Sequence, residues 1–288
     1  MRHWVNHLLA GLLLIAMIGP EGRAHDEPPK TIREKNDQQK SRDRIKAAAI
    51  ELQQVWLVKP GIAPDSSLWL SNRFDHMGNL VEQIVYDTSG NFRSICLYDD
   101  RNLLLEELSY GGDSFEDRTI FVYDGAGLVR QIASFNNSGE LTDRLNYHYN
   151  EPDQSILLEK WGPQDSLQYS ILYKYKPGSD FGSMTEAIQN NADGSLKMRV
   201  HNRYMNGQRS EKLIYGPDDN LLYSFAYTYT PSGEFNTVVK IMTNDSMAVR
   251  QQYIYTREGL LEGVVETDVS GSNTRTIHYH YIRRESGK

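Results

Sequence analysis

Two glutamates, Glu82 and Glu106, have the residue type and spacing used in carbohydrate hydrolysis. They occupy matching positions in strands that we predict to lie two apart in one sheet, which puts their backbones about 10 Å apart. Long side chains at that spacing bring two carboxyl groups into the range of a glycosidase pair. Almost every predicted strand carries a polar residue at the same position, however, and a solvated row of charges explains both glutamates better than catalysis does.

His278 and His280 form a His-x-His sequence on one predicted strand. Residues i and i+2 of a strand project from the same face, so these two imidazoles make half of a metal site. His148 and His201 project in the same way but belong to distant strands, and no third ligand is evident. We interpret all four as exposed strand histidines and expect no metal, with His278 and His280 as weak candidates.

Aromatic residues mark one face of the predicted strands. A wide aromatic surface can hold a peptide or a sugar, and the alternative is that these rings form core beneath a helix. We place Glu82 and Glu106 on the same face and treat all of these residues as candidate ligand contacts. The aromatic candidates are Tyr169, Tyr173, Tyr223, Tyr227 and Tyr279.

Other chemistry-bearing features have structural interpretations. The single cysteine, Cys96, has no internal disulfide partner and stands where similar strands carry Leu or Ile, so we expect a small core residue. The sequence has no P-loop, Rossmann glycine pattern, Gly-x-Ser-x-Gly elbow or His-Glu-x-x-His motif. We therefore predict a protein that is not an enzyme and has no cofactor.

The elements that position these residues follow from alternation. Between closely spaced turn signals such as Asn206-Gly207 and Ser232-Gly233, apolar or aromatic residues alternate with polar ones. That pattern is typical of consecutive antiparallel hairpins with one apolar and one polar face. Residues 68–288 are predicted to form an all-β domain, a curled antiparallel meander of about fifteen strands with its aromatic face concave.

The N-terminal segment has a different composition. A basic start, a short apolar run and a Gly22-Arg23-Ala24 cleavage sequence predict a signal peptide over residues 1–24. Residues 25–67 read as a linker and one amphipathic α-helix that extends to about Val58. Spacing of Ile45, Ala49, Leu52 and Trp56 predicts the helical face that docks on the sheet.

Several turns share a short repeat. Residues 86–92 (YDTSGNF) and 123–128 (YDGAGL) carry it most clearly, and residues 74–80 and 98–103 carry it in part. This unit resembles the Tyr-Asp (YD) repeat of the Rhs and teneurin family, whose repeats wind a long sheet into a shell. The resemblance implies β-hairpin geometry only, because no toxin-like domain is evident in this chain. The Asp that follows each aromatic residue is expected to cap its own turn: Asp75, Asp87, Asp99 and Asp124.

The charged residues limit the classes of partner that we expect. The net charge of −7 argues against nucleic acid as a default partner. Export and many strands also fit an outer-membrane barrel, but charged residues interrupt the predicted aromatic face, and charges at lipid depth are costly. We therefore expect a chain that does not span a membrane once its signal peptide is removed.

The sequence predicts an exported, non-catalytic β-repeat protein, secreted or periplasmic, that acts as a binding or structural module at the cell envelope or outside the cell. Its expected partner is a protein or a glycan. Two alternatives remain. One is an envelope hydrolase that acts on glycans through Glu82 and Glu106, and the other is an accessory shell fragment of a polymorphic-toxin type system.

Overall fold

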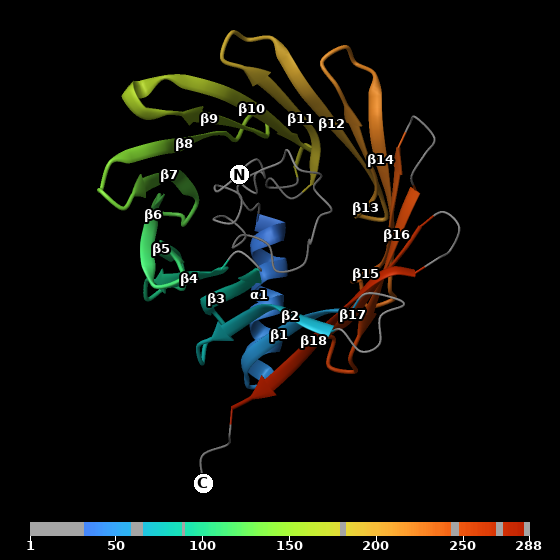
Figure 1. The fold of residues 1–288 in the computed structure, drawn as a ribbon. Coiled ribbons are helices and arrows are strands. Elements are labelled where there is room, and N and C mark those ends of the chain that lie inside the picture. The colour runs from blue at the N-terminus through green and yellow to red at the C-terminus, as the bar shows by residue number, and fades with distance from the viewer. Residues whose placement is uncertain are drawn as a thin grey trace.

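The chain forms a closed ring of strands around one helix (Figure 1). A computed structural model describes residues 32–58, 66–87, 90–178, 183–242, 248–268 and 273–284. All 18 strands belong to one antiparallel sheet, and each strand pairs with its neighbours in the sequence. The first strand also pairs with the last, so the sheet is an 18-stranded barrel in which every strand has two partners.

The elements follow one another with short connections. The helix is α1 (Ile32–Ala47), and a 3-10 turn, η2 (Pro163–Asp165), joins two of the strands. The strands are β1 (Ile50–Val58), β2 (Ser66–Phe74), β3 (Leu80–Asp87), β4 (Gly90–Tyr98), β5 (Leu104–Gly111), β6 (Ser114–Tyr123), β7 (Val129–Asn136), β8 (Leu141–Asn150), β9 (Ser155–Trp161), β10 (Leu167–Tyr175), β11 (Met184–Asn191), β12 (Leu196–Met205), β13 (Gln208–Tyr215), β14 (Leu221–Tyr229), β15 (Phe235–Met242), β16 (Ala248–Tyr255), β17 (Leu261–Thr267) and β18 (Asn273–Arg283).

The predicted all-β class and the simple meander order are confirmed, but the predicted count and shape are wrong. The described residues form 18 strands instead of about fifteen, and the sheet closes instead of curling openly. The missing strand explains the error in shape. Residues Ile50–Val58, which we assigned to the helix, form β1, and β1 is the strand that joins β18 to β2.

The helix ends earlier than predicted because the chain turns sharply after Ala47. Ala49 has a φ of 50°, which lies outside the helical region. Beyond it, Gln53 and Val55 are buried while their neighbours are more exposed, which is the period of a strand. The predicted stripe is therefore divided: Ile45 lies on α1, and Leu52 and Trp56 lie on β1.

The face of the sheet that looks into the ring is identified by α1. Ile45, 3% exposed, packs with Phe74, Leu80 and Tyr281. Residues that share a sheet face with these three are called inner, and those on the opposite side are called outer. Two apolar clusters cover much of the inner face, one across β8–β13 and one centred on β14–β18 and β1.

A β-bulge follows the turn in most hairpins. In the hairpin of β2 and β3, Phe74 pairs with Leu80 and Arg73 pairs with Glu82. Val81 is therefore an extra residue without a partner in the register. An extra residue reverses the alternation beyond it. The same shift leaves out one residue in other hairpins, including Leu105, Arg130, Thr142, Thr185, Lys197, Ser210, Leu222, Asn236 and Glu262.

Tyrosine hydroxyls satisfy backbone groups beside these bulges. Tyr98 donates a hydrogen bond of 2.8 Å to the carbonyl of Leu80, and Tyr123 donates one of 2.8 Å to the carbonyl of Leu104. A bulge disrupts the ladder locally, and a buried carbonyl needs a partner. We call this set the tyrosine hoop; its other bonds join Tyr149 to Val129, Tyr204 to Met184, Tyr229 to Arg209 and Tyr281 to Leu261.

The residue after the aromatic position caps the turn, as predicted for three of the four aspartates. Asp75 Oδ1 accepts hydrogen bonds from the backbone N–H groups of Met77, at 2.8 Å, and Asn79, at 2.9 Å. Asp99 and Asp124 make the equivalent pairs of bonds. Asp87 is the last residue of β3, and residues 88–89 of the turn that it is predicted to cap lie outside the described residues. In Tyr98-Asp99 and Tyr123-Asp124 the Tyr-Asp unit thus has a physical basis, since the tyrosine hydroxyl bonds a carbonyl beside a bulge and the carboxylate caps the turn.

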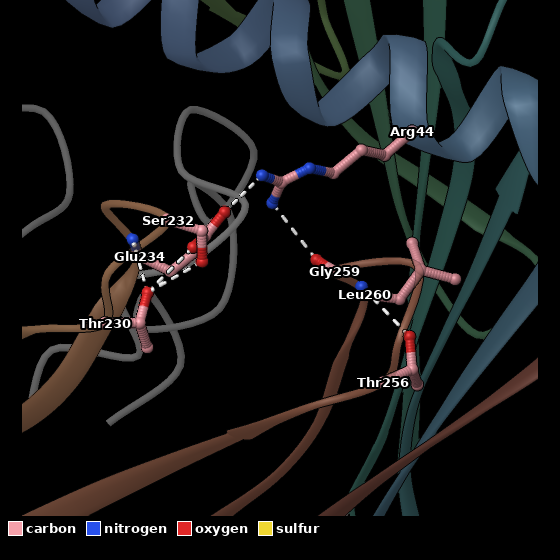
Figure 2. Close-up of polar contacts among 7 residues, drawn as sticks. All are labelled: Arg44, Thr230, Ser232, Glu234, Thr256, Gly259 and Leu260. Atoms are coloured by element: carbon pink, nitrogen blue, oxygen red, sulfur yellow. Dashed lines mark hydrogen bonds and ion pairs between the residues drawn. The ribbon is translucent and has the colours of Figure 1, made fainter.

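Helix α1 is fixed inside the ring by its last turns (Figure 2). Arg44 donates a 3.0 Å hydrogen bond to the carbonyl of Gly259 and forms an ion pair with Glu234. On the other side, Arg42 donates to the Asn79 side chain and to the carbonyl of Asn102. The helix is therefore tied to hairpin turns on both of its sides.

Candidate functional site

The predicted glutamate pair lies on the outer face, which corrects our prediction. Glu82 accepts hydrogen bonds from Arg93 at 2.6 Å and from Arg73 at 2.9 Å. Burial alone would raise the pKa of Glu82, but these two arginine bonds outweigh it and lower the pKa. Glu106 is paired with Arg118 in the same way. The bulges at Val81 and Leu105 are the cause, because they reverse the alternation just before each glutamate.

The glutamate that does face inward is Glu107, one residue further on. It is 3% exposed, and burial raises the pKa of its carboxyl from 4.5 to about 8, with a hydrogen bond from Ser94 acting in the opposite direction. The sequence analysis missed Glu107. The signal was present as two doubled pairs in a row, Leu104-Leu105 and Glu106-Glu107, which strict alternation does not produce.

Around Glu107 the inner face carries small polar side chains. Thr119 is 1% exposed, and its Oγ1 lies 3.4 Å from Ser134 Oγ. Cys96 pairs with Glu107 in the sheet register and is a buried free thiol, as predicted; burial raises its pKa. We call this region the polar wall; it consists of Ser94, Cys96, Glu107, Ser109, Thr119 and Ser134 on β4–β7.

All five predicted tyrosines lie on the inner face. Tyr173 and Tyr227 are 1% and 8% exposed, so they are core residues. Tyr169, Tyr223 and Tyr279 are half-buried and pack against the two apolar clusters. Tyr173 and Tyr227 are therefore core, and ligand contact by the other three tyrosines stays a prediction.

Two lysines stand over Tyr223, which is one of the predicted rings, and over its neighbour Phe225, which was not a candidate. Lys240 Nζ lies 4.6 Å from the ring centroid of Tyr223 and 5.9 Å from that of Phe225. Lys212 Nζ lies 5.8 Å from the Phe225 centroid. The two rings meet edge to face, with centroids 5.7 Å apart. We call these residues of β13–β15 the aromatic–cationic wall: Lys212, Tyr223, Phe225 and Lys240.

The aromatic–cationic wall is partly open to solvent and carries positive charge. Its four side chains are half-buried. Within the part of the chain that the structure describes, Lys240 has no carboxylate partner. A lysine over a ring face is held by the negative potential of the ring, so its ammonium group stays available to an anion.

A pocket on the outer face contains the His-x-His pair. Its volume is about 460 Å³, and it is lined by Trp56, Val58, His278 and His280. His278 pairs in the register with Trp56 on one side and with Gly263 on the other. Both histidines are exposed. Across the described ranges, no group of three or more His, Cys, Asp or Glu side chains is arranged to hold a metal ion.

The other two histidines have acidic partners. His148 Nε2 lies 3.2 Å from Glu159, and His201 Nε2 lies 3.4 Å from Glu186. They lie on β8 and β12, far around the ring from β18. The structure therefore does not bring the four histidines together.

Fold and site define a closed antiparallel β-barrel with an inner helix and a partly aromatic inner face. No family model matches the sequence, and no curated protein matches it. Among the residues described, no helix is both long enough and apolar enough to cross a membrane.

Solved structures that resemble the chain do so distantly. A porin-like protein from Bacteroides uniformis is 10% identical, with 81% of this chain and 98% of that chain covered and a TM-score of 0.46. A porin-like protein from Bacteroides vulgatus is 8% identical, with 81% and 99% covered and a TM-score of 0.30. A chain of the Tc holotoxin pore of Photorhabdus luminescens is 12% identical, with 73% of this chain but 16% of that chain covered and a TM-score of 0.22.

Proposed function

We propose that this protein is a non-catalytic binding module whose ligand contacts the aromatic–cationic wall. The observation that carries the proposal is the position of Lys240, which stands over Tyr223 and Phe225 with no carboxylate partner among the described residues. Ring faces stack on apolar surfaces, and a lysine beside them attracts an anion. The ligand class that fits both features is an acidic glycan.

Binding is better supported than hydrolysis. A glycosidase needs two carboxyl groups that face the same bound sugar. Glu82 and Glu106 point away from the inner face, and each is neutralised by arginine. Glu107 faces inward, and Asp117 lies near it on the same face, but Glu107 is almost fully buried and so is not accessible to a bound sugar.

The ion pairs of the outer face support a barrel whose outer surface lies in water, at the envelope or outside the cell. Ion pairs recur there, such as Glu106 with Arg118 and Glu186 with Lys174. Basic side chains at the midplane of a bilayer cost roughly 2–4 kcal/mol each. Export rests on residues 1–24, which lie outside the described residues, and it is part of the proposal.

The shell-fragment alternative is less well supported than the binding module. Tyr-Asp units do resemble those of the Rhs and teneurin family, and here they explain turn capping and the tyrosine hoop. Assembly with another chain by strand addition requires an unpaired edge. Strand β1 pairs with both β18 and β2, so the described sheet offers no such edge.

The test compares acidic and neutral oligosaccharides by isothermal titration calorimetry. Lys240→Met keeps the length of the side chain but removes its charge, and we expect it to weaken acidic-glycan binding about tenfold, since a hydrogen bond to a charged group is worth about 1.5–3 kcal/mol. Tyr223→Leu should weaken binding of the same ligands. High salt should weaken binding to the wild type more than to Lys240→Met.

Matched controls lie on the outer face. Lys174→Met removes an exposed lysine that pairs with Glu186, and Tyr215→Leu removes a ring that lies under Arg199. Both controls should bind like the wild type. Equal loss in Lys174→Met and Lys240→Met, binding of acidic peptides without glycans, or release of shortened sugars would each contradict the proposal.

A further inference from the structure

We propose that His278 and His280 form a bidentate site for a divalent transition metal in the outer-face pocket, with Cu²⁺ as the ion that binds most tightly. This site is separate from the aromatic–cationic wall, because the side chains of β18 alternate and the histidines project outward while Ile277 and Tyr279 project inward. It does not depend on the proposed glycan ligand.

Strand geometry makes the pair a chelate. Residues i and i+2 stand on one face about 6.6 Å apart along the strand. Both imidazoles open into the same pocket, whose volume of about 460 Å³ is large enough for an ion with its remaining water ligands. Two imidazole nitrogens thus reach one point from a single rigid strand.

The surroundings leave both rings available. His278 and His280 are exposed, and within the described chain neither has an acidic partner. By contrast, His148 and His201 are engaged by Glu159 and Glu186. Gly263, which pairs with His278 in the register, is buried, and a Cβ there would lie 4.0 Å from Nδ1 of His278, so the lack of a side chain at this position leaves the ring uncrowded.

The ligand set selects the ion. Two neutral imidazoles with water in the other positions suit the tetragonal geometry of Cu²⁺, which also heads the affinity order of the divalent first-row metals. Structural zinc sites use four protein ligands and catalytic zinc sites use three. Zn²⁺ and Ni²⁺ should therefore bind more weakly than Cu²⁺ at this pair.

The experiment titrates the full chain with Cu²⁺, Ni²⁺ and Zn²⁺ separately and follows binding by calorimetry and electron paramagnetic resonance. Subtracting the binding signal of the double variant His278→Ala/His280→Ala from that of the wild type leaves the signal of this site, without that of the other histidines. Either single variant should bind Cu²⁺ roughly 100-fold more weakly, because a two-point attachment becomes a one-point attachment. Nitrogen hyperfine splitting should change from two nitrogens to one.

The fluorescence of Trp56 reports where the ion binds, because Trp56 pairs with His278 in the register. Bound Cu²⁺ should quench its fluorescence, and Trp56→Phe should reduce the quenching of the whole chain, which also contains Trp69 on the adjacent strand β2. The control His148→Ala/His201→Ala should bind like the wild type. Exposed substitutions leave the far-ultraviolet circular dichroism unchanged, which separates loss of ligand from loss of fold. Equal Cu²⁺ affinity in His280→Ala and the wild type, or quenching as large in Trp56→Phe as in the wild type, would overturn the proposal.

Discussion

The polar wall of β4–β7 and the aromatic–cationic wall of β13–β15 are built on the same backbone plan. Both have a bulge after the turn, at Leu105 in one and at Leu222 in the other. Both contribute to the tyrosine hoop, through Tyr123 and Tyr229. The walls differ most clearly in the inner side chains that this backbone presents.

That difference assigns separate roles to the two walls. The polar wall is closed: Glu107, Ser109 and Thr119 are at most 3% exposed. The aromatic–cationic wall is half-open and carries two lysines over two rings. We expect a closed wall with a buried carboxyl to affect stability, and the proposed function assigns binding to the open wall with its accessible charge. Substitutions should therefore separate stability from binding according to the wall they affect.

Glu107→Gln should have the largest effect on stability. The pKa of Glu107 rises from 4.5 in an exposed carboxyl to about 8 in the fold. A raised pKa stabilises the fold fully below pH 4.5, and this contribution is lost as pH rises through 8. Glutamine stays neutral throughout. From pH 5 to pH 9 the free energy of unfolding of the wild type should fall on the order of 4 kcal/mol more than that of Glu107→Gln.

Urea denaturation at a series of pH values measures this difference. The aromatic–cationic wall supplies the control: Lys240→Met should leave the shape of the stability curve between pH 5 and pH 9 unchanged. A wild-type curve parallel to that of Glu107→Gln over this range would show that Glu107 is not buried as a neutral acid. The stability role that we expect for the polar wall would then be wrong.

Much of the fold could be predicted from alternation and turn residues, and the closure could not. The hairpins follow from runs such as Leu167 to Tyr175, where every second side chain is apolar. Residues 45–57 contain both a helical spacing and an alternating one, Gln53, Val55 and Leu57. Local sequence does not decide between them. Pairing with β18 and β2 does, and that is a contact between distant parts of the chain.

Only part of the candidate site could be predicted from the sequence, because simple alternation shows neither bulges nor contacts between strands. Inner tyrosines such as Tyr223 lie where alternation within a strand places them. Glu82 and Glu106 were assigned to the wrong face because alternation was extended through a bulge. The lysines of the wall come from different strands, β13 and β15, and meet the same ring only in the folded sheet.

The tyrosine hoop tests whether the two walls share one backbone plan. Tyr123→Phe and Tyr229→Phe each remove one hydroxyl and leave a carbonyl without its 2.8 Å partner. Each change should destabilise the fold by about 1–2 kcal/mol, the cost of one unsatisfied buried group. Thermal unfolding by circular dichroism measures both. Tyr215→Phe is the control, since its hydroxyl makes no hydrogen bond within the described residues, and it should cost almost nothing.

Equal losses on the two walls support a common plan, while a loss confined to Tyr123→Phe would mean that the aromatic wall holds its bulges by ring packing instead. The sum of Tyr123→Phe and Tyr229→Phe should equal the double variant, because the two sites lie on β6 and β14 and share no partner.

The smallest effect should come from Glu106→Gln, one residue away from the largest. Glu106 pairs with Arg118 on the outer face, and the arginine side chain is 48% exposed. An exposed ion pair contributes at most about 1 kcal/mol and is screened by salt. Urea denaturation should therefore give a loss below about 1 kcal/mol that disappears in high salt, with no change in the dependence on pH between 5 and 9. Two adjacent glutamates with opposite behaviour are what the bulge at Leu105 requires, and a large pH-dependent effect at Glu106 would place the bulge elsewhere.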